Sequence, residues 1–492
     1  YSAAAEAIVR ASGVRRGFCL VLGSETGRLA LELARRTQLR IIGIEPDGAK
    51  VAAARKALDA AGLYGARVTV DQGDLARLPY ASYFANLIVS DSALLGKLPA
   101  TPPKEVLRVL KPCGGVLMIG QPAGTPRAAL DAAALRQWAT AGKLAARMDS
   151  AGGTWARFTR GPLPGAGSWT HEYGDAANTT CGDDTFIKCP IGLLWFGDPG
   201  PLDMVSRHRR AAGPLAFDGM LFVQSENAVA AYDAYNGLKL WQRQFPGVVR
   251  VMTSHDASNL AADRESIFVV TGANQCLRLD AKTGATKYTY TMPEVDEKPR
   301  RWAYVAVSNG VLVGSGSRTD ISYGRTGPPL PPTAASAPAK TNIVSDLLFA
   351  LDVKTGTTRW TWAGQAIPHA SISVADGHVF FADGGLPAET KKAGPLSKPS
   401  IGNPMRKITS LDLNDGSVAW SREVDLTGAL GGSYFSTLGS IAHNGSLVLF
   451  GVYTDEACRR QGLAFRNLAA VLSRLRHLGG TEAELHVYAD NA

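Results

Sequence analysis

Four residues near the start of the chain have the types and the spacing of a nucleotide-binding site. Gly23 and Gly27 bracket a short turn after the apolar run 18–23, and small residues at such a turn let a ligand approach the backbone amides. Glu45 ends the next apolar run, about 20 residues further on, where an acid can bind the hydroxyl groups of a ribose. Asp74 ends a third run and is suited to hold an adenine amino group. If these runs are parallel strands, the four residues lie at one edge of the sheet.

The elements that would position these residues alternate along residues 1–150. Apolar strand-like runs lead into amphipathic helix-like runs. Strands are expected at FCLVLG (18–23), RIIGIE (40–45), RVTVDQGD (67–74), ANLIVSD (85–91) and GGVLMIG (114–120). This alternation predicts a doubly wound α/β domain with a parallel sheet, whose ligand site lies at the carboxyl ends of the strands.

Residues 5–122 resemble the class I S-adenosylmethionine (SAM)-dependent methyltransferases. The order of the elements carries the resemblance, together with Leu110–Gly115 (LKPCGG), a pattern common before the fifth strand of that family. The resemblance implies a Rossmann-like fold and SAM as the cofactor. It assigns SAM binding to the first turn and the strand ends: Gly23, Glu25, Gly27, Glu45 and Asp74. No acid–base residue for methyl transfer is identifiable from the sequence.

The glycine motif departs from the family pattern (D/E)-x-G-x-G-x-G. Val21 stands in place of the acid, and Glu25 stands in place of the middle glycine. A carboxylate there adds bulk where the cofactor approaches, and it would repel the methionine carboxylate of SAM. Two interpretations therefore stay open: a working SAM site, and a degenerate domain kept as a structural or regulatory module.

The second half of the chain repeats one turn signature, an Asp followed by Gly and then an aromatic residue at intervals of four. The copies are Asp233–Gly237–Trp241, Asp280–Gly284–Tyr288, Asp352–Gly356–Trp360 and Asp412–Gly416–Trp420. Asp can hydrogen-bond its own backbone two residues on, and Gly supplies the left-handed conformation that closes a hairpin. The aromatic residue then falls on the next strand, where it can pack against a neighbouring sheet. Because one hairpin is marginal alone, the copies must stack on one another.

The signature resembles the pyrroloquinoline-quinone (PQQ)-type β-propeller repeat, A-x-D-x-x-T-G-x-x-x-W. Thr283–Gly284 and Thr355–Gly356 match that repeat best. The spacing between successive glycines is uneven, and the extra residues fall in the Pro-rich stretches 319–342 and 386–404, which we expect to be exposed loops. We therefore expect an all-β PQQ-type propeller at residues 216–453, with about four to five blades present.

Residues 151–215 are expected to be a linker and the entry to the propeller. The stretch from Trp169 to Thr179 resembles the W-x-x-x-G-x-x-x-N-T sequence that opens many PQQ-type propellers. Within it, His171, Glu172 and Asp175 suggest either a metal or acid–base cluster or the polar residues of an ordered entry loop. We favour the entry loop.

The propeller pattern stops before residues 454–492, which are expected to form a helix followed by the strand AELHVYADNA. An R-x-x-G-x-[GA] pattern there resembles the acyl-CoA pyrophosphate loop of the GNAT (Gcn5-related) N-acetyltransferases, in which backbone amides hold phosphates. The residues concerned are Arg459, Gln461, Gly462, Leu463 and Ala464. So short an α/β tail cannot make that whole fold, so it is either a GNAT-like fragment or an ordinary terminal helix and strand.

Composition limits the classes of function. The 52 Lys and Arg residues outnumber the 43 Asp and Glu residues, but they are scattered, and we recognise no nucleic-acid-binding module. The six cysteines include no CxxC pair, so we expect neither a zinc site nor a disulfide framework. No apolar run reaches the about 18 residues that span a bilayer. We expect a soluble multidomain protein without a metal site, and its compartment, cytoplasmic or periplasmic, stays open.

Three hypotheses of function follow. The first is a SAM-binding domain coupled to a propeller recognition platform, with methyl transfer to an unknown substrate. The second is a scaffold without enzymatic activity, whose propeller binds a protein or a carbohydrate. The third is a PQQ-dependent oxidoreductase, but the sequence lacks the vicinal cysteines of quinoprotein alcohol dehydrogenases, and no residues can be assigned to their calcium site. We therefore expect neither PQQ nor calcium.

Overall fold

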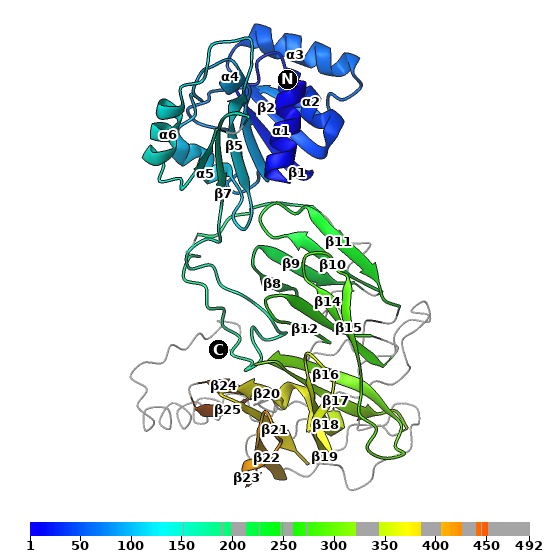
Figure 1. The fold of residues 1–492 in the computed structure, drawn as a ribbon. Coiled ribbons are helices and arrows are strands. Elements are labelled where there is room, and N and C mark those ends of the chain that lie inside the picture. Colours follow the sequence, from blue (N-terminus) through cyan, green and yellow to red (C-terminus); the bar gives the residue numbers. More distant parts are fainter. Residues whose placement is uncertain are drawn as a thin grey trace, which may run out of the picture.

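The computed structural model shows an α/β domain joined end to end with a group of antiparallel sheets (Figure 1). It describes residues 1–150, 152–187, 190–197, 213–225, 227–246, 248, 259–271, 274–320, 344–384, 405–425, 439–443 and 445–450. Within these ranges, no helix is both long enough and apolar enough to cross a lipid bilayer.

The N-terminal domain is built on a seven-stranded sheet in the order β3-β2-β1-β4-β5-β7-β6. Its strands are β1 (Arg16–Leu22), β2 (Gln38–Glu45), β3 (Val68–Gln72), β4 (Leu87–Ser90), β5 (Val116–Pro122), β6 (Arg147–Asp149) and β7 (Gly153–Thr159). Strands β1 to β5 are parallel, and the direction of winding reverses between β1 and β4. Ligands of such sheets bind at the carboxyl ends of the strands beside this reversal. The predicted doubly wound α/β fold is confirmed.

Two antiparallel strands that the sequence analysis did not predict complete this sheet. Strand β7 pairs antiparallel with β5, and β6 pairs antiparallel with β7. Because side chains alternate along a strand, Trp155 and Ala156 of β7 pack into the apolar cores on opposite faces. The domain therefore continues to Thr159, past residue 150 and into the stretch that was expected to be a linker.

Helices cover both faces of the sheet (Figure 1). They are α1 (Ser2–Ser12), α2 (Arg28–Arg36), α3 (Gly48–Ala60), α4 (Asp91–Leu94), α5 (Pro103–Val109) and α6 (Ala132–Ala141). Apolar residues of α1, α2 and α3 pack on one face, and those of α5 and α6 pack on the other. The Asp47 side chain caps α3 by accepting hydrogen bonds from the amides of Ala49 and Lys50. The amphipathic runs in the sequence thus become the helices that enclose the two cores.

The described residues of the second part of the chain form four four-stranded sheets and one two-stranded sheet. The first sheet contains β8 (Leu215–Phe217), β9 (Met220–Gln224), β10 (Ala228–Asp233) and β11 (Lys239–Gln244); the second contains β12 (Leu260–Ala262), β13 (Ser266–Val270), β14 (Gln275–Asp280) and β15 (Thr286–Thr291). The third contains β16 (Arg300–Ser308), β17 (Val311–Arg318), β18 (Val344–Asp352) and β19 (Thr358–Pro368). The fourth contains β20 (Ser373–Ala375), β21 (His378–Asp383), β22 (Met405–Asp412) and β23 (Val418–Asp425), and the last pair is β24 (Gly439–His443) with β25 (Ser446–Phe450).

These sheets follow one another as an arc of propeller blades. The first strands of successive sheets contact one another, so they lie on the inner side of the arc (Figure 1). Four full sheets and one pair agree with the predicted four to five blades. The Pro-rich stretches lie almost entirely outside the described residues.

Each repeat turn has the geometry that its residues predict. The glycines have φ angles of 70° at Gly237, 70° at Gly284, 69° at Gly356 and 73° at Gly416, in the left-handed region. In every copy the glycine amide donates to the carbonyl of the repeat Asp, whose carboxylate accepts from backbone amides two residues on. A β-bulge follows in each hairpin and places the aromatic residue on the outermost strand of its sheet.

The aromatic residue of one sheet packs on the glycine turn of the next, which we call the aromatic–glycine contact. A Cβ atom placed on Gly284 would lie 2.7 Å from the Trp241 ring, and one on Gly416 would lie 2.6 Å from the Trp360 ring. Tyr288 lies equally close to Gly356, with a distance of 2.5 Å to its hydroxyl. The glycine is therefore required twice, for its backbone conformation and for the space that the ring of the preceding sheet occupies.

One short segment, residues 169–178, contacts the inner strand of each propeller sheet that the structure describes, and we call it the entry segment. Its backbone pairs with Ala216 of β8 and bonds the amides of Ala262 in β12, Val374 in β20 and Ala442 in β24. His171 Nε2 accepts from the amide of Val307 in β16. Asn178 donates to the carbonyls of Ile372 and Ser440, which joins the fourth sheet to the last pair. The entry segment therefore ties the arc together from its inner side.

Candidate functional site

The first strand–helix turn of the N-terminal domain has three residues in the left-handed region. The φ angles are 56° at Gly23, 50° at Glu25 and 76° at Gly27, where α2 begins. A Cβ on Gly23 would lie 3.1 Å from the Ser92 hydroxyl, so the turn packs closely against the start of α4, which follows β4. Glu25 adopts this conformation although it is not a glycine, which costs about 1–2 kcal/mol. The turn is thus placed at the carboxyl edge of the sheet, as the sequence predicts.

Glu45, at the end of β2, is buried beside that turn. One of its carboxylate oxygens accepts from the amide of Glu25 at 2.9 Å, and the other accepts from the amide of Asp47 at 3.2 Å. The carboxylate therefore holds the glycine turn and the start of α3 in position. Each oxygen keeps a second lone pair with which to accept from a ligand hydroxyl.

The Glu25 side chain is turned toward a lysine of α3. Its carboxylate lies 2.6 Å from Lys50 Nζ, and this hydrogen bond raises the pKa of Lys50 above its usual value. The expected repulsion between Glu25 and a SAM carboxylate is therefore offset by a neighbouring cation. The expected bulk remains, because the side chain occupies this edge of the sheet.

Asp74 lies at the end of β3 but is exposed. Its carboxylate accepts from the amide of Ala76 at 2.7 Å, which closes a turn within its own loop. The structure therefore brings Gly23, Glu25, Gly27 and Glu45 together and gives Asp74 a local role in the turn. An adenine contact by Asp74 stays a prediction.

Two polar residues at the same edge were missed in the sequence. Ser24 and Asp91 are fully buried, and the Ser24 hydroxyl has no hydrogen-bond partner among the described residues. Neither Asp91 oxygen has a partner of normal geometry there, although the Tyr1 side chain and the Leu29 amide are close enough to favour the charged form. Burial outweighs these contacts and raises the pKa of Asp91 to about 7.

A sequence signal existed for Asp91. It ends the expected fourth strand, 85–91, as Glu45 ends the second, 40–45. Buried polar atoms without partners are rare in proteins and cost about 1–3 kcal/mol each. Their clustering beside a glycine turn and the N-terminus of α2 points to a polar ligand at this edge.

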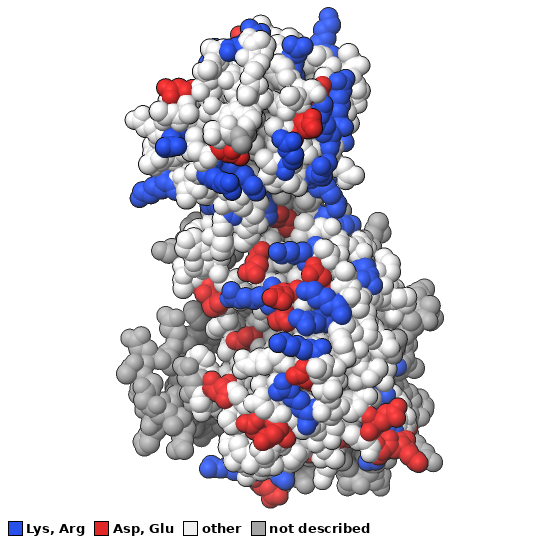
Figure 2. Space-filling view, in the orientation of Figure 1, with Lys and Arg blue, Asp and Glu red and all other residues white. Residues whose placement is uncertain are grey.

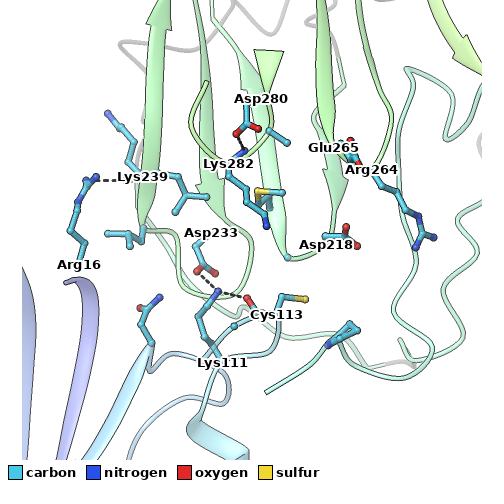
Figure 3. A pocket seen from close by; sticks show the side chains of 18 of the residues that line it. Arg16, Lys111, Cys113, Asp218, Asp233, Lys239, Arg264, Glu265, Asp280 and Lys282 are labelled. Atoms are coloured by element: carbon cyan, nitrogen blue, oxygen red, sulfur yellow. Dashed lines mark hydrogen bonds and ion pairs between the residues drawn. The ribbon is translucent and has the colours of Figure 1, made fainter. Parts of the chain in front are cut away.

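A cavity lies at the opposite edge of the sheet, where the α/β domain meets the propeller (Figure 3). This cavity, of about 1070 Å³, is lined by the starts of β1 and β4, by the loop before β5 and by the first two propeller sheets. Ten charged side chains line it: Arg16, Lys111, Lys239, Arg264, Lys282, Lys287, Asp218, Asp233, Glu265 and Asp280. Figure 2 shows basic and acidic side chains alternating along the propeller below this junction.

The first repeat turn makes several of the contacts across the junction. Asn236 donates to the Phe84 carbonyl at 2.8 Å and to the Asn86 side chain at 2.9 Å. Tyr235 packs edge-on against Tyr83, with ring centroids 5.8 Å apart. The first turn reads Tyr-Asn where the best-matching repeats read Lys-Thr, and these two departures are the residues that contact the α/β domain.

The polar residues of the entry segment have structural partners. His171 is buried between the Thr170 hydroxyl and the Val307 amide, and burial lowers the pKa of His171 to about 4. Glu172 accepts from the Gly213 amide, and Asp175 accepts from the amide and hydroxyl of Thr179. In the part of the chain that the structure describes, no three His, Cys, Asp or Glu side chains come together as metal ligands. The entry-loop interpretation therefore fits this segment.

Comparisons with known proteins divide the chain in the same way. The family model of a methyltransferase domain matches residues 19–114, and that of the outer membrane protein assembly factor BamB matches residues 169–327. The model of the acetyltransferase (GNAT) family matches residues 397–492. No curated protein matches the chain. The chain thus combines a methyltransferase-like α/β domain with a PQQ-like propeller region.

Solved structures with similar parts are distant. A SAM-dependent methyltransferase from Aquifex aeolicus is 16% identical, over 32% of this chain and 87% of its own, with a TM-score of 0.28. Quinohemoprotein alcohol dehydrogenases of Pseudomonas putida and Comamonas testosteroni are 14% and 15% identical, over 58% and 57% of this chain, with TM-scores of 0.36. This chain covers only 44% and 45% of those two enzymes. Likeness at this level carries no argument about ligand or activity.

The acetyltransferase match begins at residue 397, well before the predicted residue 454. It includes β22 and β23, which belong to the fourth propeller sheet. The predicted acyl-CoA residues, Arg459 and Gln461–Ala464, lie outside the described residues, so their role stays a prediction.

Proposed function

We propose that the N-terminal domain binds SAM at the carboxyl edge of its sheet and transfers its methyl group to an acceptor that enters from solvent. The observation that carries this proposal is a pair of buried side chains beside a glycine turn, Ser24 and Asp91, whose polar atoms lack a hydrogen-bond partner of normal geometry among the described residues. A polar ligand at this edge would supply the partners that these atoms lack. The match of residues 19–114 to a methyltransferase domain makes SAM the ligand to test.

Different residues of this edge would bind different parts of SAM. Glu45 has free lone pairs for ribose hydroxyls, and the Gly23–Gly27 turn leads into α2, whose N-terminus favours negatively charged ligand groups. Bound SAM would supply a methyl group that is activated by its sulfonium charge. Asp91, with a pKa of about 7, is the group at this edge that can hold or accept a proton near neutral pH.

The propeller lies far from the SAM edge. The first repeat turn contacts the amino ends of β4 and β5, whereas the SAM edge lies at the carboxyl ends. A seven-residue strand such as β1 separates the two edges by roughly 20 Å. A ligand held on the propeller is therefore not presented directly to the SAM edge of the same molecule.

Calorimetry on the full chain with SAM and S-adenosylhomocysteine tests the proposal. We expect micromolar binding that weakens at least tenfold in Glu45→Gln and in Asp91→Asn, because each variant removes a carboxylate from the edge. Glu32→Gln is the matched control, since Glu32 pairs with Arg35 and Arg36 on the outer side of α2 and should leave binding unchanged. No heat of binding at millimolar SAM would reject the proposal.

The scaffold remains the second candidate. It is favoured by the separation of the propeller from the SAM edge, which leaves the propeller free to bind a protein or carbohydrate by itself. The junction cavity has the size of a small-ligand site. Met220 and Leu240 line it together with the charged side chains. Retention of the chain on an immobilised protein or glycan, with no response to SAM, would support this function instead.

A further inference from the structure

The charges that line the junction cavity are not balanced. Six of the side chains are basic and four are acidic. Two of the acids are neutralised, because Asp233 pairs with Lys111 at 2.7 Å and Asp280 pairs with Lys287 at 3.0 Å. Four basic side chains then face two carboxylates, so the cavity keeps an excess of two positive charges.

Two ammonium groups of the cavity, one from each domain, have hydrogen-bond donors to spare. Figure 3 shows the Lys282 side chain extending into the cavity toward Lys111 and Cys113. The Lys282 ammonium group makes no hydrogen bond or ion pair with any other residue that the structure describes. Lys111 Nζ donates to the Asp233 carboxylate and, at 3.3 Å, to the Cys113 carbonyl, which leaves one of its three N–H groups for a ligand.

The direct contacts between the domains do not extend to the second propeller sheet. Among the described residues, the hydrogen bonds and ion pairs that cross from the α/β domain end on residues 233–239 of the first sheet. The second sheet lines the other side of the cavity through residues 264–265 and 280–282. A ligand in the cavity would therefore join the α/β domain to the second sheet, which the chain itself leaves separate.

The cavity fits an anion that carries an apolar group. Its volume of about 1070 Å³ is much larger than a bare ion needs, and Met220, Leu238 and Leu240 give it an apolar wall. A phosphate monoester has about two negative charges at pH 7 and three acceptor oxygens. Its charge equals the excess in the cavity, and its oxygens can accept from ammonium groups that approach from different sides.

We propose that the junction cavity binds a small organic phosphate monoester. The phosphate group accepts hydrogen bonds from Lys111 and Lys282, and the organic group packs against Met220 and Leu240. The site lies at the amino ends of β1 and β4, at the opposite edge of the sheet from the SAM site, so it does not depend on SAM. Its occupant holds the α/β domain against the second propeller sheet.

Calorimetry of the full chain with phenyl phosphate, in chloride buffer of constant ionic strength, tests this proposal. Lys282→Gln should weaken binding at least about tenfold, because it removes a charged donor while leaving every described contact in place. Lys354→Gln is the matched control and should bind as the unaltered chain does. Lys354 has the same position in the third repeat turn, with its amide bonded to Asp352 as that of Lys282 is to Asp280, and it lies outside the cavity.

Asp218→Asn should change the affinity in the opposite direction. The Asp218 carboxylate lines the cavity and has no cation paired with it among the described residues. Its removal should tighten the binding of phenyl phosphate by about threefold, because a like charge near the phosphate is lost. Asparagine suits this backbone, since Asn309 has the same φ of 48° at the corresponding turn of the third sheet.

Alkylation of Cys113 by iodoacetamide, measured by mass spectrometry, tests the contact with the α/β domain without any substitution. The half-buried Cys113 thiol lines the cavity, so phenyl phosphate should slow its alkylation several-fold. Cys181, which is exposed outside the cavity, is the internal control and should react at an unchanged rate.

Three results would overturn the proposal. The first is no heat of binding at millimolar phenyl phosphate. The second is equal binding by the Lys282 and Lys354 variants, which would indicate a general attraction of phosphate to exposed lysines. The third is binding that leaves the alkylation of Cys113 unchanged, which would place the ligand on the propeller alone. Inorganic phosphate should bind more weakly than phenyl phosphate, and equal affinities would show that the apolar wall takes no part.

Discussion

Lys111 and Asp233 form an ion pair across the junction, with 2.7 Å between Nζ and Oδ2 and exposed fractions of 10% and 3%. Each residue belongs to the motif that characterises its own domain. Lys111 is the lysine of the LKPCGG sequence before β5, and Asp233 is the Asp of the first repeat turn. Figure 3 shows the two side chains meeting at the wall of the junction cavity.

Replacing Lys111 by Met should therefore destabilise the junction, because it leaves the Asp233 carboxylate buried without its cation. Removing one partner of a buried pair costs about 3–5 kcal/mol. Lys287→Met, which breaks the more exposed pair with Asp280, should cost less than about 1 kcal/mol. Urea unfolding of the two variants measures the difference. Equal losses would show that the Lys111–Asp233 pair is not buried in solution.

A glycine turn under an aromatic ring should tolerate alanine much less than a glycine turn in the open. Gly284 and Gly310 have φ angles of 70° and 76°, so Ala is strained at both. At Gly284 the new methyl group also meets Trp241 at 2.7 Å, whereas at Gly310 nothing lies within 4 Å. We expect a loss of about 1–2 kcal/mol for Gly310→Ala and of about 2–5 kcal/mol for Gly284→Ala. Thermal unfolding of the two variants tests this order, and equal losses would contradict the aromatic–glycine contact.

The stability of the N-terminal domain should depend on pH through the titration of Asp91. Burial raises its pKa to about 7 in the folded state, so the folded state keeps a proton that the unfolded state releases near pH 4. The stabilisation is complete below pH 4 and is lost as the pH rises toward 7, by on the order of 4 kcal/mol. Asp91→Asn cannot ionise, so its stability should not fall over this range. Urea unfolding at pH 4.5 and pH 8, monitored on the α/β domain, gives the comparison, and parallel slopes would contradict the assignment.

The titration of His171 should make the stability of the propeller depend on pH in the opposite direction. Its pKa is lowered to about 4 by burial, and its Nε2 must stay unprotonated to accept from the Val307 amide. The stabilisation is complete above the usual histidine pKa of about 6.5 and is lost as the pH falls toward 4, by about 3 kcal/mol. His171→Gln keeps an acceptor and removes the titration. Near-ultraviolet circular dichroism during acid titration measures the shift, which should be absent in the variant.

Local chemistry explains which features were predictable from the sequence. The four repeat turns were predicted because Asp and Gly close each hairpin through contacts within a few residues. The strand ends Gly23 and Glu45 were predicted because parallel strands bring their carboxyl ends to one edge. Both arguments need only the periodicity of the chain and the conformations that its residues prefer.

What was missed depends on contacts between distant residues. Asp91 looks like the polar end of a strand, and it is distinguished only by its burial with no partner of normal geometry among the described residues. Trp195 lies outside the repeat spacing, and only the structure shows that its ring packs on a repeat glycine turn, as that of Trp241 does. Glu25 was expected to oppose the cofactor, and its pairing with Lys50 could not be predicted because the two residues belong to different elements.

The entry segment has a consequence for how this protein folds and unfolds. Stacked repeats that contact only their neighbours can fray from one end, one unit at a time. Here Asn178 is bonded to Ser440, 262 residues later in the chain, and the same segment contacts all five sheets. The segment leaves the ribosome before every sheet that it binds, and its last partner arrives only when the final pair of strands is made. The arc should therefore fold slowly and melt as a single cooperative unit.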